Sequence, residues 1–455
     1  MIITVKAKET LRWLVPRVAI ILLVACLTAC KRGSNEVVLR LHGSNTIGRE
    51  LAPALVEGYL KQAGAKDIRR IEGDVPDEVK IQAVLPGEDT VKIVEIKAHG
   101  SDTAVQALEE GKCDIAMMSR RLKGDEAERL ARLGGMNEHV IAMDGIAIIV
   151  NTDNAVRELN LGQVAQIFTG DIRDWSQVKG RSGGINVYAR DDKSGTFDTF
   201  KNLVLGKDKK LYTTRERFED SKLLSEAVAA DPNGIGFVAL PFIGSTKAVA
   251  LYEEGGQAYL PSPMTINQRK YLLHRELYFY LPKKNQVRLA EDFIKFAESK
   301  EGQDIVGKVG FVSQNISPVV PAATPEPAAE DIPAELARIR KAYKGTSNLP
   351  PLVFSTGVSD LDSKSLVDFG RIVGLLETDG AKEITVVGFA DNTGTPAKNL
   401  ALSEERAKHV KEEFVRIGYD PASITVKQFG QEAPVRLNDT DEGRRLNRRV
   451  EVYYK

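Results

Sequence analysis

The chain has 455 residues, more than a single hydrophobic core usually organises, so two or more domains are expected. Hydrophobic residues make up 42% of it and charged residues 28%, which is typical of an ordinary globular protein. Lys plus Arg and Asp plus Glu each number 63, so no net charge would steer the whole chain toward nucleic acid or an anionic membrane. Any anion site must therefore be local.

The first thirty residues have the pattern of a signal peptide. A basic stretch precedes an apolar run, 18–29, that is too short to span a bilayer comfortably. The run ends in four residues that resemble the lipobox of bacterial lipoproteins, Leu27-Thr28-Ala29-Cys30. The resemblance implies removal of residues 1–29, lipidation of Cys30 as a membrane anchor, and a short tether over 30–36. A plain secretory signal with an incidental cysteine is the alternative.

Two residues refine this prediction. Lys31 follows the cysteine where some lipoproteins have aspartate, and in Gram-negative bacteria this pattern resembles lipoproteins sent to the outer membrane. With Cys26 removed and Cys30 lipidated, Cys113 is the one remaining cysteine, so no intrachain disulfide is expected. Because Cys113 lies in an apolar run, it is predicted to be a small buried hydrophobe.

The rest of the chain divides into two α/β domains. Over 37–313 short β-branched runs alternate with helical patterns, which predicts a mixed α/β domain with strands at 37–41, 91–96, 140–150 and 185–188. Prolines over 314–333 predict an extended spacer, which is the clearest domain boundary. A small α/β domain is expected over 334–455, beginning with a helical pattern at 334–343.

Three predicted strand-to-helix junctions in the first domain carry clusters of Gly, Ser and Thr. A helix N-terminus presents unpaired N–H groups, glycine lets an anion approach the backbone, and hydroxyls add donors. Arg190 precedes the third cluster and would add a charge-assisted contact. Each cluster alone is more often an ordinary helix cap. Together they predict a site for a tetrahedral oxyanion at Gly43-Ser44-Asn45-Thr46, Gly100-Ser101-Asp102-Thr103 and Ser194-Gly195-Thr196.

With the segments at 114–120, 144–151 and 167–170, these clusters resemble the phosphate-binding proteins of ABC-type uptake systems, in family order. The resemblance implies a type II-like periplasmic-binding fold, in which two lobes joined by crossover strands close on the anion. It implies inorganic phosphate as ligand and an ABC permease as a partner. It assigns the ligand contacts to Ser44, Thr46, Ser101, Ser119, Arg120, Arg190, Ser194, Gly195 and Thr196.

Arg120 departs from the best-known members of that family, which have an aspartate there that accepts the proton of bound phosphate. A carboxylate would favour protonated phosphate and repel sulfate, whereas an arginine would accept either anion. Asp102 and Asp144 are the candidates for a replacement acceptor. Phosphate remains the first choice, and another oxyanion stays open.

In the last domain a predicted strand, 384–390, leads to a turn at 391–394, and a helix is expected to begin near Asn399. Arg406 lies two turns after Asn399 on one stripe of this helix and is placed to face the loop of Asp391. The neighbouring stripe is expected to face the core and consists of Leu400, Ser403, Ala407, Val410 and Phe414.

The segments at 388–394, 399–407 and 443–451 resemble the OmpA-like peptidoglycan-binding domain. In that family an aspartate takes the ammonium group and an arginine the carboxylate of diaminopimelate in the wall peptide. The resemblance assigns these roles to Asp391 and Arg406, with Asn399 as a flanking polar contact. Without it, a simple salt bridge would be the preferred interpretation. Phe389 and Ala390 stand where the family often has His-Thr, so one side contact is expected to be lost.

Catalysis is not expected. The five histidines are scattered, and the sequence has neither a nucleophile elbow nor a Walker-type loop, so no enzyme activity, cofactor, metal or nucleic-acid partner is predicted. The resulting hypothesis is a periplasmic phosphate-binding lipoprotein, anchored to the outer membrane and tethered to peptidoglycan, within or beside ABC-type phosphate uptake. The alternative is a wall-anchoring structural or sensor lipoprotein that recognises another oxyanion or has lost its transport role.

Overall fold

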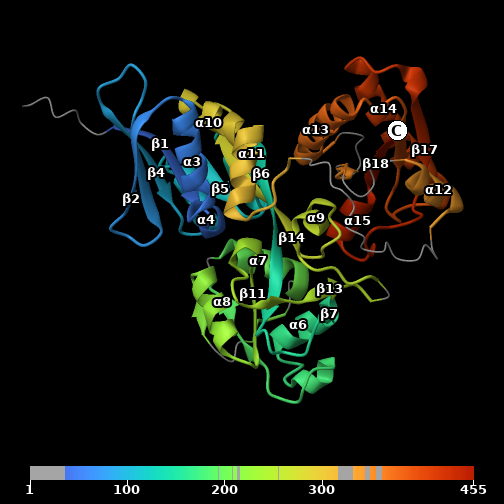
Figure 1. Ribbon diagram of the computed structural model, residues 1–455, viewed down its shortest axis with the longest axis horizontal. Coiled ribbons are helices and arrows are strands. Elements are labelled where there is room, and N and C mark those ends of the chain that lie inside the picture. The colour runs from blue at the N-terminus through green and yellow to red at the C-terminus, as the bar shows by residue number, and fades with distance from the viewer. Residues whose placement is uncertain are drawn as a thin grey trace, which may run out of the picture.

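The computed structural model describes residues 36–192, 194–206, 209–212, 216–254, 256–315, 332–343, 349–354 and 361–455. The protein has two lobes and a C-terminal domain, and the strands β6 (Met136–Val150) and β14 (His274–Pro282) lie between them (Figure 1). The predicted signal peptide, Cys30 and most of the predicted spacer at 314–333 lie outside the described residues.

The first lobe is a mixed sheet with helices packed on its faces, and the strand order is β2-β3-β4-β1-β5-β14-β6. Its strands are β1 (Glu36–Gly43), β2 (Lys66–Glu72), β3 (Glu78–Val84), β4 (Val91–Lys97), β5 (Ile115–Met118), β6 (Met136–Val150) and β14 (His274–Pro282). Its helices are α2 (Asn45–Gly48), α3 (Leu51–Gln62), α4 (Ser101–Glu109), α5 (Gly124–Arg132), α10 (Arg288–Glu298) and α11 (Lys300–Val309).

The second lobe continues the same sheet through β6, which pairs with β11, while β8 lies beyond β11 and β12 also pairs with β6. Its strands are β7 (Glu158–Asn160), β8 (Asn186–Val187), β9 (Ala189–Arg190), β10 (Arg217–Phe218), β11 (Gly234–Ala239), β12 (Lys247–Ala248) and β13 (Ala250–Tyr252). Its α-helices are α6 (Leu161–Thr169), α7 (Gly195–Phe200), α8 (Ser221–Ala230) and α9 (Pro263–Asn267).

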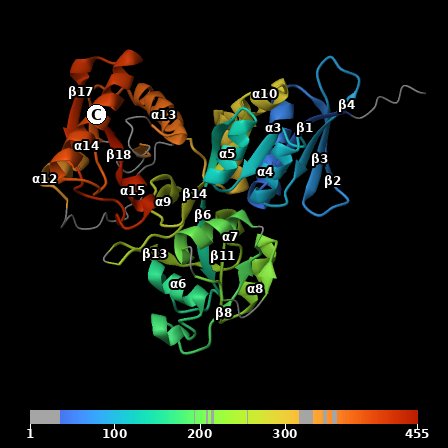
Figure 2. The ribbon, with the colours of Figure 1, turned by 180° about the vertical axis from the view of Figure 1, so that it is seen from behind.

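The long strand β6 joins the two lobes. Its first part pairs antiparallel with β14 as far as Gly145, and its second part, from Ile146, pairs antiparallel with β11. Apart from Asp144 and Gly145, residues 140–150 are hydrophobic, as expected for a strand covered on both faces. The chain crosses back to the first lobe through β14, so β6 and β14 together form the hinge region (Figure 2).

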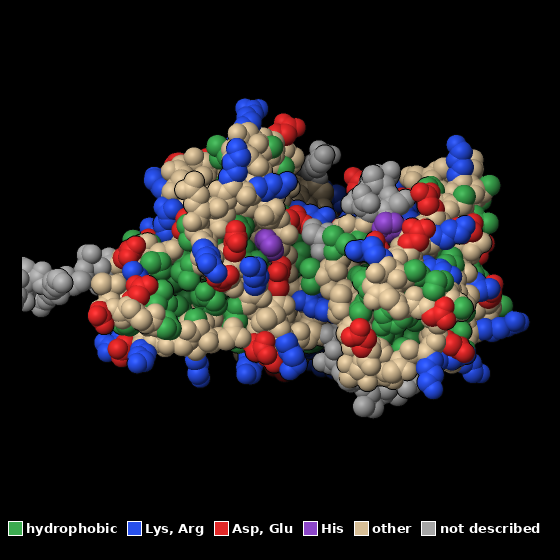
Figure 3. Space-filling model, turned by 90° about the horizontal axis from the view of Figure 1, so that it is seen from above, with side chains coloured by type: hydrophobic (Ala, Val, Ile, Leu, Met, Phe, Trp, Pro, Cys, Tyr) green, Lys and Arg blue, Asp and Glu red, His purple; other side chains and the backbone are tan. Residues whose placement is uncertain are grey.

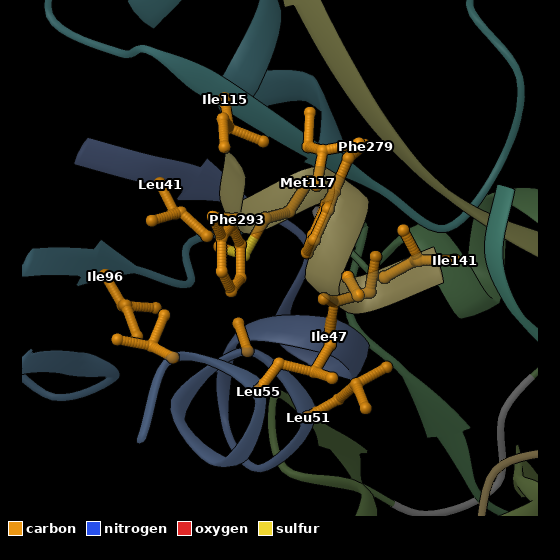
Figure 4. Packing of buried hydrophobic residues seen from close by; sticks show 14 of the residues in the cluster. Leu41, Ile47, Leu51, Leu55, Ile96, Ile115, Met117, Ile141, Phe279 and Phe293 are labelled. Carbon is orange, nitrogen blue, oxygen red and sulfur yellow. The ribbon is translucent and has the colours of Figure 1, made fainter. Parts of the chain in front are cut away.

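The core of the first lobe lies between its sheet and the helices α3, α10 and α11. Figure 4 shows Leu41 and Ile96 of the sheet pointing toward Leu55 of α3 and Phe293 of α10. All four side chains are fully buried. Burial of each one stabilises the fold by roughly 1.5–3 kcal/mol.

The C-terminal domain is a four-stranded sheet in the order β15-β18-β16-β17 with helices beside it. Its strands are β15 (Leu352–Val353), β16 (Ile384–Gly388), β17 (Ile424–Gln428) and β18 (Arg449–Tyr454). Its α-helices are α12 (Ala334–Ala342), α13 (Ser363–Asp379), α14 (Pro396–Arg416) and α15 (Asp441–Asn447).

The core face predicted for α14 is wrong at one position. Leu400 is 46% exposed, whereas the other four residues of the predicted face are buried. Asn399 is buried in its place, because α14 turns this side chain toward the loop after β17, where its amide donates to Gln431.

The outer surface carries mixed charge. On the face seen in Figure 3, Lys and Arg are interspersed with Asp and Glu over both the first lobe and the C-terminal domain. Within the described residues no helix is long and apolar enough to cross a membrane. Those same residues contain no group of three or more His, Cys, Asp or Glu that could hold a metal ion.

Candidate functional site

Hydroxyl groups from both lobes meet in the cleft between them. Thr46 Oγ1 of the first lobe lies 3.1 Å from Thr196 Oγ1 of the second. Nearby, Ser101 Oγ lies 3.2 Å from Ser119 Oγ. A Cβ added to Gly195 would collide with Ser119 Oγ and lie 2.7 Å from Ser101 Oγ. The two lobes are therefore closed against each other, and position 195 has room only for a glycine.

The predicted strand-to-helix junctions position these groups. Strand β1 ends at Gly43, whose φ of +134° suits glycine, and α2 begins two residues later with Ser44 as its N-cap. The Oγ of Ser44 is buried and has no hydrogen-bond partner among the described residues. Ser194 is a helix cap, since its Oγ accepts a hydrogen bond from Phe197 N at 3.3 Å. It therefore organises the α7 end of the cleft.

Arg190, at the end of β9, is a buried cation beside the hydroxyl cluster. Its guanidinium donates to Phe218 O at 3.1 Å, to Glu219 O at 2.5 Å and to Ser221 Oγ. Among the described residues it makes no ion pair with a carboxylate, although the charges of Asp191 and Asp220 act on it. Burial lowers the pKa of Arg190 to about 10, so it stays charged at neutral pH. It lines a cavity of about 10 Å³ together with Thr46.

A second buried arginine was not predicted from the sequence. Arg275 on β14 donates to Thr196 Oγ1 at 3.0 Å and lies 3.4 Å from Thr46 Oγ1, so it reaches hydroxyls of both lobes. Its partner is Asp144 on β6, at 2.6 Å. Burial raises the pKa of Asp144 despite the opposing charge of Arg275. The other carboxylate oxygen of Asp144 accepts from Leu240 N at 3.0 Å.

Arg120 lies among carboxylates at the rim of the cleft. It pairs with Asp102, with Glu126 at 2.7 Å and with Asp198 of α7 at 3.2 Å. Burial would lower the pKa of this guanidinium, but the carboxylates raise it by more. Lys123 also pairs with Asp198, at 3.2 Å. The structure therefore places Arg120 in an ion-pair network that joins the two lobes, with its charge compensated by acidic side chains.

The C-terminal domain holds a second polar site at the end of β16. Asp391 accepts hydrogen bonds from Thr393 and from Arg448 Nη1, the latter at 2.8 Å. Burial would raise the pKa of Asp391, but these hydrogen bonds lower it by more. Arg406 on α14 donates to Phe389 O at 3.4 Å. Its positive charge also interacts favourably with the carboxylate of Asp391.

Asn399 completes this site. Its amide nitrogen donates to Gln431 at 2.7 Å, while its Oδ1 is buried without a hydrogen-bond partner among the described residues. The side chains of Asp391, Asn399 and Arg406 are all buried at this end of the domain. A carboxylate and a guanidinium at one site can bind a zwitterion whose ammonium and carboxylate are spaced to match.

Two regions of the chain match known protein families. Residues 78–301 match the PBP superfamily domain, and residues 353–448 match the OmpA family. The chain joins a PBP superfamily domain to an OmpA family domain. The resemblances stated for the first domain and for the C-terminal domain, and the fold class that they implied, are confirmed, whereas the lipobox resemblance stays a prediction.

Curated relatives of the PBP domain are named phosphate-binding proteins. The phosphate-binding protein PstS of Borreliella burgdorferi is 26% identical over 289 residues, which cover 62% of this chain and 92% of the relative. PstS of Pseudomonas aeruginosa is 29% identical over 259 residues, covering 52% and 78%. The crystal structure of an ABC-type phosphate transport receptor from Vibrio cholerae shares 25% identity with a TM-score of 0.47, covering 60% of this chain and 99% of that one.

Sequence reasoning missed two arginines, one in each domain. Arg275 interrupts an otherwise apolar strand as part of His274-Arg275-Glu276, and three polar residues in a buried strand are a signal that could have drawn attention. Arg448 lies in the segment at 443–451, to which the sequence assigned no ligand contact, yet it is the arginine hydrogen-bonded to Asp391. In the sequence it follows a helix end and precedes β18, so its direction depends on the turn between them.

Proposed function

We propose that the PBP domain binds inorganic phosphate in the cleft between its lobes. The observation that carries the proposal is Arg190, a buried guanidinium whose hydrogen bonds go to neutral oxygens. A buried guanidinium that makes no direct ion pair is costly, so the site favours an anion. The hydroxyls of Thr46, Ser101, Ser119 and Thr196 supply neutral donors around it. The names of the curated relatives support phosphate as that anion.

The remaining predicted ligands take different roles in the proposal. Ser44 Oγ, which is unpartnered, and the amides of Gly195 and Thr196 are further donors to the anion. Ser194 shapes the start of α7 as its cap. Arg120 acts through the rim network instead of touching the anion, because three carboxylates surround it.

We further propose that the OmpA family domain binds the peptide of peptidoglycan. In this proposal Asp391 takes the ammonium group of diaminopimelate and Arg406 its carboxylate, with Asn399 Oδ1 as a flanking acceptor. Arg448 orients Asp391 through their 2.8 Å hydrogen bond.

A PBP superfamily domain and an OmpA family domain in one chain support a location in the cell envelope. We propose that it works in the periplasm, captures phosphate without chemically changing it, and serves in or beside ABC-type uptake. The lipobox resemblance supports a lipid anchor on Cys30 in the outer membrane. Mass spectrometry of the native protein and of Cys30→Ser would test the anchor, since a mass increase of diacylglyceryl size is expected only for the former.

Titration calorimetry tests the binding proposal. The chain from Lys31 to Lys455 is unfolded and refolded to strip anions, and then titrated with phosphate and with sulfate. Saturable phosphate binding that Arg190→Ala abolishes is expected, while Arg173→Ala, a remote arginine whose guanidinium bonds Gly170 O, should bind normally. Absence of binding by either anion would overturn the receptor function. Tighter binding of sulfate would keep the site and change its ligand.

A further inference from the structure

The OmpA domain is docked on the hinge region of the PBP domain through specific hydrogen bonds. Arg436 Nη2 donates to Leu272 O at 2.9 Å, just before β14, and Arg436 is buried. Leu437 N donates to Glu253 Oε2 at 3.1 Å, and Glu253 Oε1 lies 3.7 Å from Arg436 Nε. Figures 1 and 2 both place α15 beside α9 and β14.

A buried cluster of charges fills the rest of this interface. On the PBP side Glu276 of β14 lies 3.1 Å from Arg269 and 3.7 Å from Arg121. On the OmpA side Asp362 lies 3.9 Å from Arg121 and 3.0 Å from Arg445. Burial alone would raise the pKa of Glu276, but the charges of Arg445, Arg269 and Arg121 lower it well below its usual range.

Such a cluster is costly to form unless its members are held in one arrangement. Lys364 and Asp368 at the start of α13 form a 2.5 Å ion pair that is almost fully buried, and α13 packs against β6. Separating the domains would expose these groups, and a loose tether would not require them. The interface therefore has the character of a defined contact.

The docked domain contacts both lobes. Arg121 belongs to the first lobe, whereas Leu272 and Glu253 belong to the second. Because the lobes are closed in this arrangement, with Thr46 against Thr196, the contact bridges them in their closed state. A domain that contacts both lobes when they are closed favours the closed state.

The two faces of β14 connect this interface with the anion site. Successive residues of a strand point to opposite faces. Arg275 reaches Thr196 and Asp144 in the cleft, while Glu276 faces the interface with the OmpA domain. A shift of β14 that accompanies opening of the lobes therefore moves both faces together.

The interface is also connected with the proposed wall-peptide site of the OmpA domain. Arg445, in the interface, is three residues before Arg448, which bonds Asp391. Asn447 between them accepts hydrogen bonds from the N–H groups of Val435 and Arg436. The interface segment and the predicted wall-peptide site thus share one short stretch of chain.

We propose that the OmpA domain acts as a brace on the hinge of the PBP domain, which favours the closed lobes and thereby raises the affinity for the anion. The proposal rests on the proposed phosphate function for its ligand, but the docking and the closure do not require a ligand. The proposal therefore links attachment to the wall thermodynamically with binding of phosphate.

The experiment uses the chain from Lys31 to Lys455 and a charge reversal at the interface. Glu253→Lys places a cation opposite Arg436, and Glu254→Lys, at the exposed neighbouring position, is the matched control. Arg445→Ala is a second interface variant. We expect calorimetry to show phosphate Kd values roughly fivefold or more weaker for both interface variants, as for a typical coupling between sites, and unchanged for the control.

A ligand-free readout separates this proposal from the phosphate function. Fluorescent labels on cysteines replacing the exposed Lys61 of the first lobe and Lys222 of the second report the distance between lobes. In Glu253→Lys without anion this distance should lengthen, and in Glu254→Lys it should not. Unchanged distance and Kd in both interface variants would overturn the brace. A wild-type chain that binds no phosphate, but whose lobes open in Glu253→Lys, would overturn the receptor function and retain the brace.

Discussion

Substitution of Gly195 by alanine should weaken phosphate binding without weakening the fold. Gly195 is the first residue of α7, with a negative φ that alanine adopts freely. With the lobes closed, its Cβ would collide with Ser119 Oγ and lie 2.7 Å from Ser101 Oγ across the cleft. Overpacking of this kind costs about 1–3 kcal/mol. Since binding requires closure, the Kd for phosphate should rise roughly 5- to 150-fold.

Opening of the lobes relieves this collision. The stability of the ligand-free protein should therefore fall only by the free energy that favours its closed lobes, about 1 kcal/mol for a fivefold coupling. Gly124→Ala is the matched control, because Gly124 is also the first residue of its helix, α5, and nothing lies within 4 Å of its added Cβ. Calorimetric titration gives the Kd of each variant, and urea unfolding gives its stability.

Two results would refute the reasoning. Wild-type affinity in Gly195→Ala would mean that the anion binds without closure of this contact. Equal loss of affinity in Gly124→Ala would mean that the effect comes from the helix start and not from the cleft.

Three further predictions concern other sites. Asp391→Ala should abolish co-sedimentation with peptidoglycan, while Asp439→Asn, at an exposed position in the same domain, should sediment like wild type. Burial would raise the pKa of Glu451, but neighbouring arginines lower it to about 2, so its ionised form stabilises the fold above about pH 4.5 and this stability is lost as pH falls toward 2. Glu451→Gln should therefore destabilise the domain by about 3 kcal/mol at pH 7 and much less near pH 2, as measured by urea unfolding; an equal effect at both pH values would contradict this. Burial raises the pKa of Cys113 to about 12, so a thiol reagent should modify it only after unfolding; fast labelling of the native protein would exclude the buried position.

The sequence predicted the features that depend on neighbouring residues. The junctions before Thr46, Ser101 and Thr196 are local patterns of strand, turn and helix, and the structure has a helix at each of them. The strand expected at 140–150 lies within β6 because a hydrophobic run of that length needs burial on both faces.

Features that depend on distant pairing were not predictable in this way. Arg275 enters the cleft because β14 pairs with β6, which brings it beside Asp144, 131 positions earlier in the chain. The exposure of Leu400 follows from the rotation of α14 about its axis. Packing sets this rotation, and helical spacing alone predicts the buried face only to within one residue. The contact of Arg436 with Leu272 depends on the docking of two separately folded regions.

The alternation of side chains along β14 also constrains how this protein can change during evolution. Arg275 serves the cleft and Glu276 serves the domain interface, so point substitutions can alter one of these without the other. An insertion or deletion of one residue in the strand would exchange their faces and damage both at once. Relatives that keep both domains are therefore expected to vary in residue type along this strand, but not in its length.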